Sequence, residues 1–396
     1  MQQGSQTCPE DIKSLILKLV SDLKVSKKLH LAASIEANWQ KTAMDYSKEL
    51  NEWVPSRPIE PELLSAFEKE LGRVGMSAIT TPKVLGSLAT RRVIQTAPHL
   101  GATEIPRMLS INWLGSLGIG PEDFYVVGMF SGIPFSNNFR PGRINMKNSS
   151  INLFPSALQD AMIYRSLIPQ KLTDSLKELP VKLKILLPEA KPGDSYTKWA
   201  LNACQNIERK ILSKDNLIYL DINEVISEYL LRILNKKDHV IYKIFFDPEI
   251  KNAFYKVFPS ETIFYRPTTD GKYEKMENVT LSEIVSREKL IEELIKGRLC
   301  PGLLLQFLVL VFLNEFKCFG SFRQVEYLPE YQQKLRTLSF LKEYNIANVP
   351  TMNLTTGSLE NNPYPVDIIL GEKFFPGEDM LFGELLINMK DTLLDK

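Results

Sequence analysis

Apolar residues recur every three or four positions near the start of the chain, which is the spacing that places side chains on one face of a helix. The clearest run is Ile12, Leu15, Ile16, Leu19, Val20 and Leu23. This spacing predicts helices over residues 9–50, and Pro61 opens another that runs through Leu71. Residues 1–80 are therefore predicted to form a helical N-terminal segment.

The pattern changes between Arg91 and Arg143, where short apolar runs alternate with a helix-length block. Val93–Ala97 is a partly β-branched run that stops at Pro98, which predicts a buried strand. Arg107–Leu117 has the length and apolar content of a helix, and Phe124–Phe130 predicts a second strand. A strand, a helix and a second strand form a βαβ unit, and such units build parallel sheets. We therefore predict an α/β fold with a Rossmann-like parallel sheet core.

Further runs extend this core toward the C-terminus. Val181–Leu187, Asn216–Leu220 and His239–Phe246 are predicted strands, and a helical insertion is predicted around 155–235. The apolar run Leu303–Leu313 is far shorter than the ~20 residues that span a membrane, so it is predicted to be a buried core element. The core is predicted to cover 81–345, followed by a loop-rich segment over 346–396 that ends in a helix.

Composition narrows the classes of partner. The formal net charge is +1, so no overall basic field favours nucleic acid. The four cysteines are far apart and there are only three histidines, which argues against a zinc site and against a disulfide framework. The N-terminal residues lack the basic and apolar regions of a signal peptide. These features predict a cytoplasmic protein with a small-molecule substrate, no metal, and no nucleic acid or membrane partner; they leave the oligomeric state open.

The first candidate site follows the first predicted strand. Thr96, His99 and Gly101 occupy the turn before the helix, where an imidazole and the first helical amides can meet an anion. Nucleotidylyltransferases use a His-x-Gly-His motif at such a junction, but Ala102 stands here at the position of the second histidine. The competing interpretation is a histidine that caps a turn.

Two other clusters carry polar side chains suited to binding. Ser136, Asn137, Asn138 and Arg140 follow the second predicted strand, and ligands of open α/β sheets bind at such strand ends. The amides suit an amino acid or a sugar and the arginine suits a carboxylate or a phosphate, whereas the alternative is a solvated loop. Far along the chain, after the apolar core run, come Gly320, Arg323, Gln324 and Tyr327. There the glycine permits close approach of a ligand and the polar residues can contact it, although a simple turn into a helix also explains them.

The order of these elements resembles the cysteine-adding enzyme family of bacillithiol synthesis. The resemblance is carried by Thr96-Ala-Pro-His99, by Pro106, by the run VVGMFSGIPFSNN, and by the late segment Leu299–Leu305 with Gly320–Tyr327. It implies a Rossmann-like core, a nucleotide or amino-sugar pocket, and formation of a C–N bond. At Ser136–Asn138 the chain departs from the family's acidic-histidine pattern, which leaves the co-substrate open.

Together, these features predict a ligase or transferase that joins an amino acid, or a similar acid, to an amine in small-molecule biosynthesis. His99 would stabilise negative charge or exchange a proton, and Thr96 and Gly101 would shape the anion site. One alternative is a nucleotidylyl- or glycosyl-transferase with a nucleotide as co-substrate at His99. A second alternative is a non-catalytic binding protein.

Overall fold

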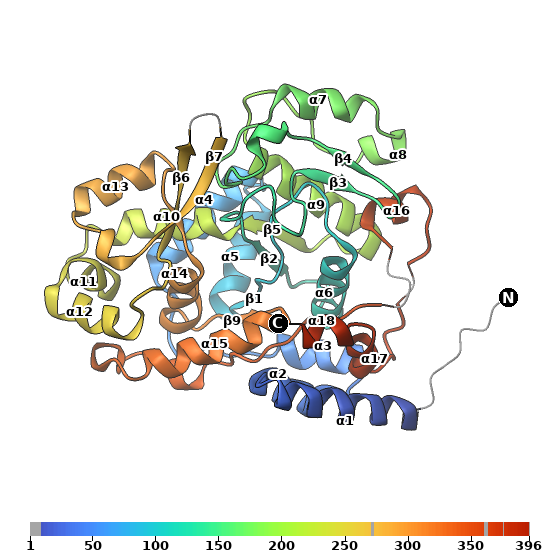
Figure 1. Ribbon diagram of the computed structural model, residues 1–396, viewed down its shortest axis with the longest axis horizontal. Coiled ribbons are helices and arrows are strands. Elements are labelled where there is room, and N and C mark those ends of the chain that lie inside the picture. Colours follow the sequence, from blue (N-terminus) through green and yellow to red (C-terminus); the bar gives the residue numbers. More distant parts are fainter. Residues whose placement is uncertain (1–8, 271–272, 360–362, 375, 396) are drawn as a thin grey trace.

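The fold is built on a four-stranded parallel sheet with strand order β5-β2-β1-β9. The computed structural model describes residues 9–270, 273–359, 363–374 and 376–395. The strands are β1 (Val93–Gln95), β2 (Tyr125–Met129), β5 (Leu217–Asp221) and β9 (Lys317–Phe319). Helices surround the sheet (Figure 1), so the predicted α/β, Rossmann-like core is confirmed.

The predicted βαβ unit is also confirmed. α6 (Pro106–Leu117) connects β1 to β2, and the two strands pair in parallel with Gln95 opposite Val127. On its other side β1 pairs in parallel with β9, where Val93 lies opposite Lys317. All described side chains of β1 and β2 are buried, as expected for strands covered on both faces.

Helices from both ends of the chain cover this sheet. The N-terminal segment supplies α1 (Pro9–Val25), α2 (Leu29–Asn38), α3 (Ala43–Asn51), α4 (Pro61–Val74) and α5 (Thr80–Thr90). The middle and end of the chain supply α7 (Gln170–Lys177), α9 (Tyr196–Leu212), α10 (Ile222–Ile233), α12 (Pro248–Val257), α13 (Arg287–Ile295), α15 (Phe322–Leu335) and α16 (Pro365–Leu370). α3 packs on α6 and α4 packs on α10, so the predicted N-terminal helices contribute directly to the core.

Two smaller sheets lie outside the parallel one. β3 (Arg143–Asn145) and β4 (Ser150–Asn152) form an antiparallel hairpin. β6 (Phe264–Asp270) pairs with β7 (Tyr273–Val279) and with β8 (Cys300–Pro301). Tyr265 of β6 lies edge-on to Phe130 at 6.3 Å between ring centroids, which joins this sheet to the end of β2.

The strand predicted at Val181–Leu187 is wrong, because α8 (Val181–Lys184) occupies its start. Pro180 precedes the helix and fixes a backbone angle suited to that position. Val181 and Ile185 are 73% and 76% exposed, and only Leu183 of the helix is buried, so this apolar run does not join the parallel sheet.

The strand predicted at His239–Phe246 is also wrong, because α11 (Val240–Phe246) forms there. His239 caps the helix, its Nδ1 accepting a hydrogen bond from the Ile241 N–H at 3.1 Å. The buried side chains are Val240, Ile241, Ile244 and Phe245, whose spacing is helical. The β-branched and aromatic composition favoured a strand, and the cap together with tertiary packing overrode it.

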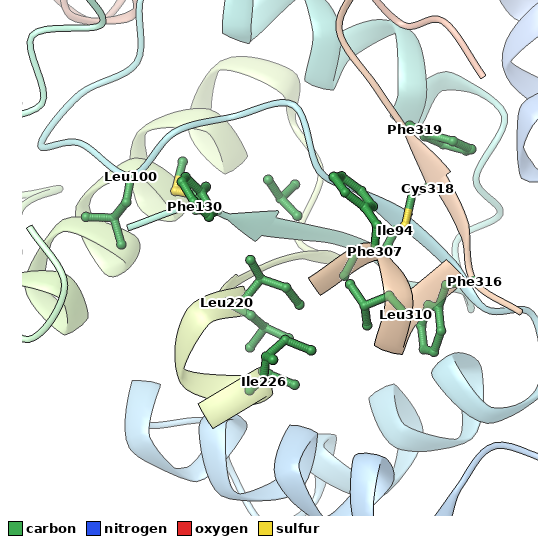
Figure 2. Close-up of a cluster of buried hydrophobic side chains, with 14 of the residues drawn as sticks. Ile94, Leu100, Phe130, Leu220, Ile226, Phe307, Leu310, Phe316, Cys318 and Phe319 are labelled. Atoms are coloured by element: carbon green, nitrogen blue, oxygen red, sulfur yellow. The ribbon is translucent and has the colours of Figure 1, made fainter. Parts of the chain in front are cut away.

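The predicted core element over Leu303–Leu313 is confirmed as buried. It begins as α14 (Leu303–Phe307) and continues as a π-helical segment over Leu308–Leu313. Figure 2 shows Phe307 and Leu310 of this element in one cluster with Ile94 of β1, Leu220 of β5 and Ile226 of α10. No described helix is both long enough and apolar enough to cross a membrane.

The segment over 346–396 contributes more than surface loops. Its predicted closing helix is divided into α17 (Phe382–Ile387) and α18 (Lys390–Leu394). Thr355 and Thr356 are fully buried, and Gly320 bridges to Leu354 beside β9. This part of the chain therefore covers the edge of the parallel sheet.

Candidate functional site

A cavity of about 330 Å³ opens where β1, β2 and β9 end. Its walls come from the loop after β1, the start of α6, the loop after β2, α14, the start of α15 and α18. The carboxyl ends of parallel strands are where open α/β sheets bind ligands. β1 neighbours β2 on one side and β9, from far along the sequence, on the other. This arrangement makes the cavity the candidate site.

The structure brings together six of the predicted site residues in this cavity. They come from three segments that are far apart in the sequence: Thr96, His99, Asn138, Arg323, Gln324 and Tyr327. The first predicted cluster and the late segment therefore face the same space. A non-catalytic binding protein would be supported if Thr96, His99 and Arg140 pointed away from one another. Thr96 and His99 share the cavity, whereas Arg140 lies outside it.

Five predicted residues do not line it: Gly101, Ser136, Asn137, Arg140 and Gly320. Gly101 packs against Pro141, and its carbonyl accepts a hydrogen bond from Cys204. The Ser136 hydroxyl donates to Asp160 at 3.0 Å on the surface. Arg140 is exposed with a left-handed φ of 50°, so it turns the loop instead of binding in the cavity.

His99 is held by the ends of both central strands. Its backbone bridges to Phe130, and its ring lies edge-on to Phe139 at 4.5 Å between centroids. Nδ1 is buried and has no hydrogen-bond partner among the described residues. Burial lowers the pKa of His99 to about 4, the side chain of Asn137 acts in the opposite direction, and the charges of Arg107 and Arg323 lower it further. The imidazole is therefore neutral at pH 7 and carries both a donor and an acceptor nitrogen.

Thr96 and Gln324 form the contact between the two predicted clusters. The Thr96 hydroxyl can donate a hydrogen bond to Gln324 Oε1, at 3.1 Å, or to the Phe319 carbonyl oxygen, at 2.9 Å. Gln324 Nε2 donates to the same carbonyl at 3.3 Å. This network joins the end of β1 to the end of β9 and to the first turn of α15.

Gly320 makes that network possible by leaving room for Gln324. A Cβ atom at position 320 would lie 2.4 Å from Cδ and 2.7 Å from Cβ of Gln324. Since the close atoms include the base of the side chain, Gln324 could not avoid the clash by rotating its amide alone. Gly320 does not line the cavity, but its lack of a side chain allows Gln324 to take its place in the cavity wall.

We expect Gly320→Ala to displace Gln324 from Thr96 and to destabilise the protein by about 1–3 kcal/mol, the usual effect of overpacking. Urea unfolding measures the change in stability. Gly72→Ala is the matched control, because a Cβ atom there meets nothing within 4 Å. Equal stabilities for the two variants would contradict the supporting role of Gly320.

Arg107 is the principal site residue that sequence analysis missed. It lies in the first turn of α6, directly after Pro106, and its guanidinium Cζ is 5.6 Å from the centroid of Phe139. Burial lowers the pKa of Arg107, and the charge of Arg323 adds to this effect. Its place in the first helical turn after a strand end is the signal that could have identified it.

Apolar and aromatic side chains form most of the remaining wall. The missed lining residues are Ala97, Met108, Ile111, Phe130, Phe139, Ile222, Leu303, Gln306, Phe307, Ser321, Phe322, Thr356, Thr392 and Asp395. Thr356 also accepts a hydrogen bond from the Phe322 N–H at 2.9 Å, which fixes the start of α15. A few polar groups among apolar walls are typical of sites for small organic molecules.

A buried acidic pair lies next to the loop that carries His99. Glu104 and Glu208 are both buried, and each has one carboxylate oxygen without a partner among the described residues. The other oxygen of Glu208 accepts from Asn112 at 3.0 Å and from the Tyr219 hydroxyl. Burial raises the pKa of Glu208 to about 7 and raises that of Glu104 well above its usual range.

This pair predicts that stability falls as pH rises. Between the unfolded pKa of Glu208, near 4.5, and its folded pKa, near 7, the folded state retains a proton that the unfolded chain releases. We expect Glu208→Gln, which keeps the acceptor oxygen, to stabilise the protein above pH 7 by up to about 3 kcal/mol. Urea unfolding at pH 5 and pH 8 measures this difference. Destabilisation of the variant by the same amount at both values would contradict it.

No group of three His, Cys, Asp or Glu side chains within the described ranges could hold a metal ion. A nucleotide at the His99 turn, the cofactor that the sequence suggested, would lie in the same cavity as Arg107 and Arg323. No protein-family model and no curated protein matches the chain. The resemblance to the bacillithiol-synthesis family therefore remains a prediction from the sequence.

Proposed function

We propose that this protein is a ligase or transferase that forms a C–N bond between an acid and an amine, with the acid bound in the cavity at the ends of β1, β2 and β9. The observation that supports it best is the meeting of His99 with Arg107 and Arg323 in one partly apolar space. Two cationic side chains there attract an anionic substrate, and a neutral imidazole can exchange a proton with an amine.

His99 is the proposed proton-transfer residue. As an amine attacks an activated acid, the C–N bond forms and the bond from the acyl carbon to its leaving group breaks. The amine loses a proton in this step, and the neutral imidazole can accept it while the leaving group departs with its electron pair. The buried Nδ1 of His99 has no hydrogen-bond partner among the described residues, although a hydrogen bond with the Asn137 side chain raises the pKa of the ring against the effect of burial. Thr96 and Gln324 are proposed to position the substrate because they share one hydrogen-bond network at the cavity wall.

A nucleotidylyl- or glycosyl-transferase is the second candidate. It is favoured by the two helix starts and the two arginines, which are groups that bind phosphates. The cavity volume of about 330 Å³ is at the small end of the range for ligand pockets, which favours a small acid over a whole nucleotide.

A thermal-shift panel of amino acids, amino sugars and nucleotides tests these candidates. Mixtures of the compounds that stabilise the protein are then examined for a new amide or amine product by mass spectrometry. A product joining an acid to an amine supports the proposal, a nucleotidylated or glycosylated product supports the second candidate, and a shift with none of the compounds argues against both enzymes.

A further inference from the structure

The two arginines of the cavity gather around one aromatic ring. The guanidinium carbons of Arg107 and Arg323 each lie 6.0 Å from the centroid of Phe322, and Arg107 also faces Phe139. Within the described part of the chain, neither guanidinium has an ion-pair or hydrogen-bond partner. Arg107 is half-buried and Arg323 is exposed. By contrast, Arg73 is paired with Glu70 and Arg165 with Glu224.

Bringing two like charges together in a partly apolar cavity is unfavourable unless an anion joins them. Asp395 lines the same cavity, yet it forms no ion pair with either arginine in the described structure. Among the described residues, neither guanidinium is thus held by a carboxylate, which leaves both side chains able to donate hydrogen bonds to an anionic ligand.

The backbone adds to this preference. α6 and α15 have 12 and 14 residues, and both begin at the cavity, with Arg107 and Arg323 in their first turns. The N-terminus of a helix carries a partial positive charge that favours anions. His99 contributes a neutral donor to the same space without adding a third positive charge.

We propose that the ligand of this cavity carries a phosphate monoester, held between Arg107 and Arg323, on a compact apolar body. A phosphate has three terminal oxygens and close to two negative charges, so it can engage two guanidiniums at once and neutralise both. A single carboxylate has one charge and two oxygens, which one arginine can already satisfy. Met108, Ile111, Phe130 and Phe307 line the space that would receive the apolar body.

This inference deepens the proposed function, because it names the chemical class of the acid that binds in the same cavity. It rests on the cavity being the ligand site and does not depend on the reaction. Phosphate binding without any C–N bond product would overturn the proposed function and leave this inference standing. A C–N bond product formed from an acid without a phosphate would overturn this inference and support the proposed function.

The test is isothermal titration calorimetry with phenyl phosphate and with benzoate, two probes that share a ring and differ in the anionic group. We expect phenyl phosphate to bind about tenfold more tightly than benzoate, or better. Arg107→Gln and Arg323→Gln should each weaken phenyl phosphate binding by about tenfold or more, because each removes charge-assisted hydrogen bonds. Arg107→Lys should recover only part of the affinity, since it restores charge without the guanidinium fork.

Arg140→Gln is the matched control, because Arg140 belongs to the loop after β2 but is exposed and outside the cavity. Its affinity should equal that of the unmodified protein. Melting curves establish that each variant is folded. Equal or tighter binding of benzoate, no binding of phenyl phosphate to the folded unmodified protein, or unchanged affinity in both glutamine variants would overturn the proposal.

Discussion

Replacement of His99 by alanine should lower turnover by at least about 100-fold, the usual contribution of a positioned acid or base, while leaving the fold intact. The ring faces the cavity and has no hydrogen-bond partner at Nδ1 among the described residues, so its removal breaks no buried hydrogen bond at that atom. The rate is measured on the acid and amine identified by the ligand panel, and circular dichroism checks the fold.

The pH dependence separates a proton-transfer role from a packing role. Because burial lowers the pKa of His99 to about 4, kcat/KM should fall on the acidic side near pH 4 and not near 6.5. His30→Ala, on partly exposed α2 and outside the cavity, is the control and should retain the full rate. An unchanged rate in folded His99→Ala would refute the catalytic assignment.

Replacement of Arg73 by methionine should destabilise the protein by about 3–5 kcal/mol, the usual result of removing one partner of a buried ion pair. Arg73 donates to both oxygens of Glu70, at 2.6 and 2.8 Å, and Glu70 is only 3% exposed. Without the guanidinium, the Glu70 carboxylate would retain only the Asp221 N–H as a hydrogen-bond donor among the described residues. Urea unfolding at pH 7 measures the effect.

Two comparisons test this explanation. The double variant Arg73→Met/Glu70→Gln should recover much of the lost stability, because a neutral amide can still accept from Asp221. The deficit of the single variant should also shrink as pH falls, since an unpaired buried carboxyl then takes up a proton. Arg232→Met, which removes an exposed pair with Glu228, should cost less than about 1 kcal/mol; a similar loss in both single variants would contradict the role of burial.

Local pattern was sufficient where an element could be recognised from its own residues. The βαβ unit over Val93–Met129 was predicted correctly because both strands are buried and their runs are mainly apolar, with a helix-length block of residues between them. The helical insertion predicted around 155–235 contains α9, which is capped by Ser195 through a hydrogen bond from the Lys198 N–H. The β-branched and aromatic composition of Val240–Phe246 predicted a strand, but these residues form a helix.

Strand β9 shows why part of the candidate site was missed. It contains only Lys317, Cys318 and Phe319, too few residues for any periodic signal, and it becomes a strand by pairing with β1. That pairing places α15 beside the loop after β1, and with it Arg323 and Gln324 beside His99. The sequence identified the cluster Gly320–Tyr327 as polar residues after an apolar run. It could not show that this cluster lies beside His99.

The sequence by itself determined the class of fold, the first parallel strand pair, the buried element over Leu303–Leu313, and six of the residues that line the cavity. These features depend on local periodicity and on residue type. Only the tertiary structure decided that Arg107 and Arg323 line one cavity without an ion-pair partner among the described residues, and that the buried His99 in that cavity is neutral. Both facts depend on long-range pairing and on burial, and neither quantity can be read from the spacing of residues along the chain.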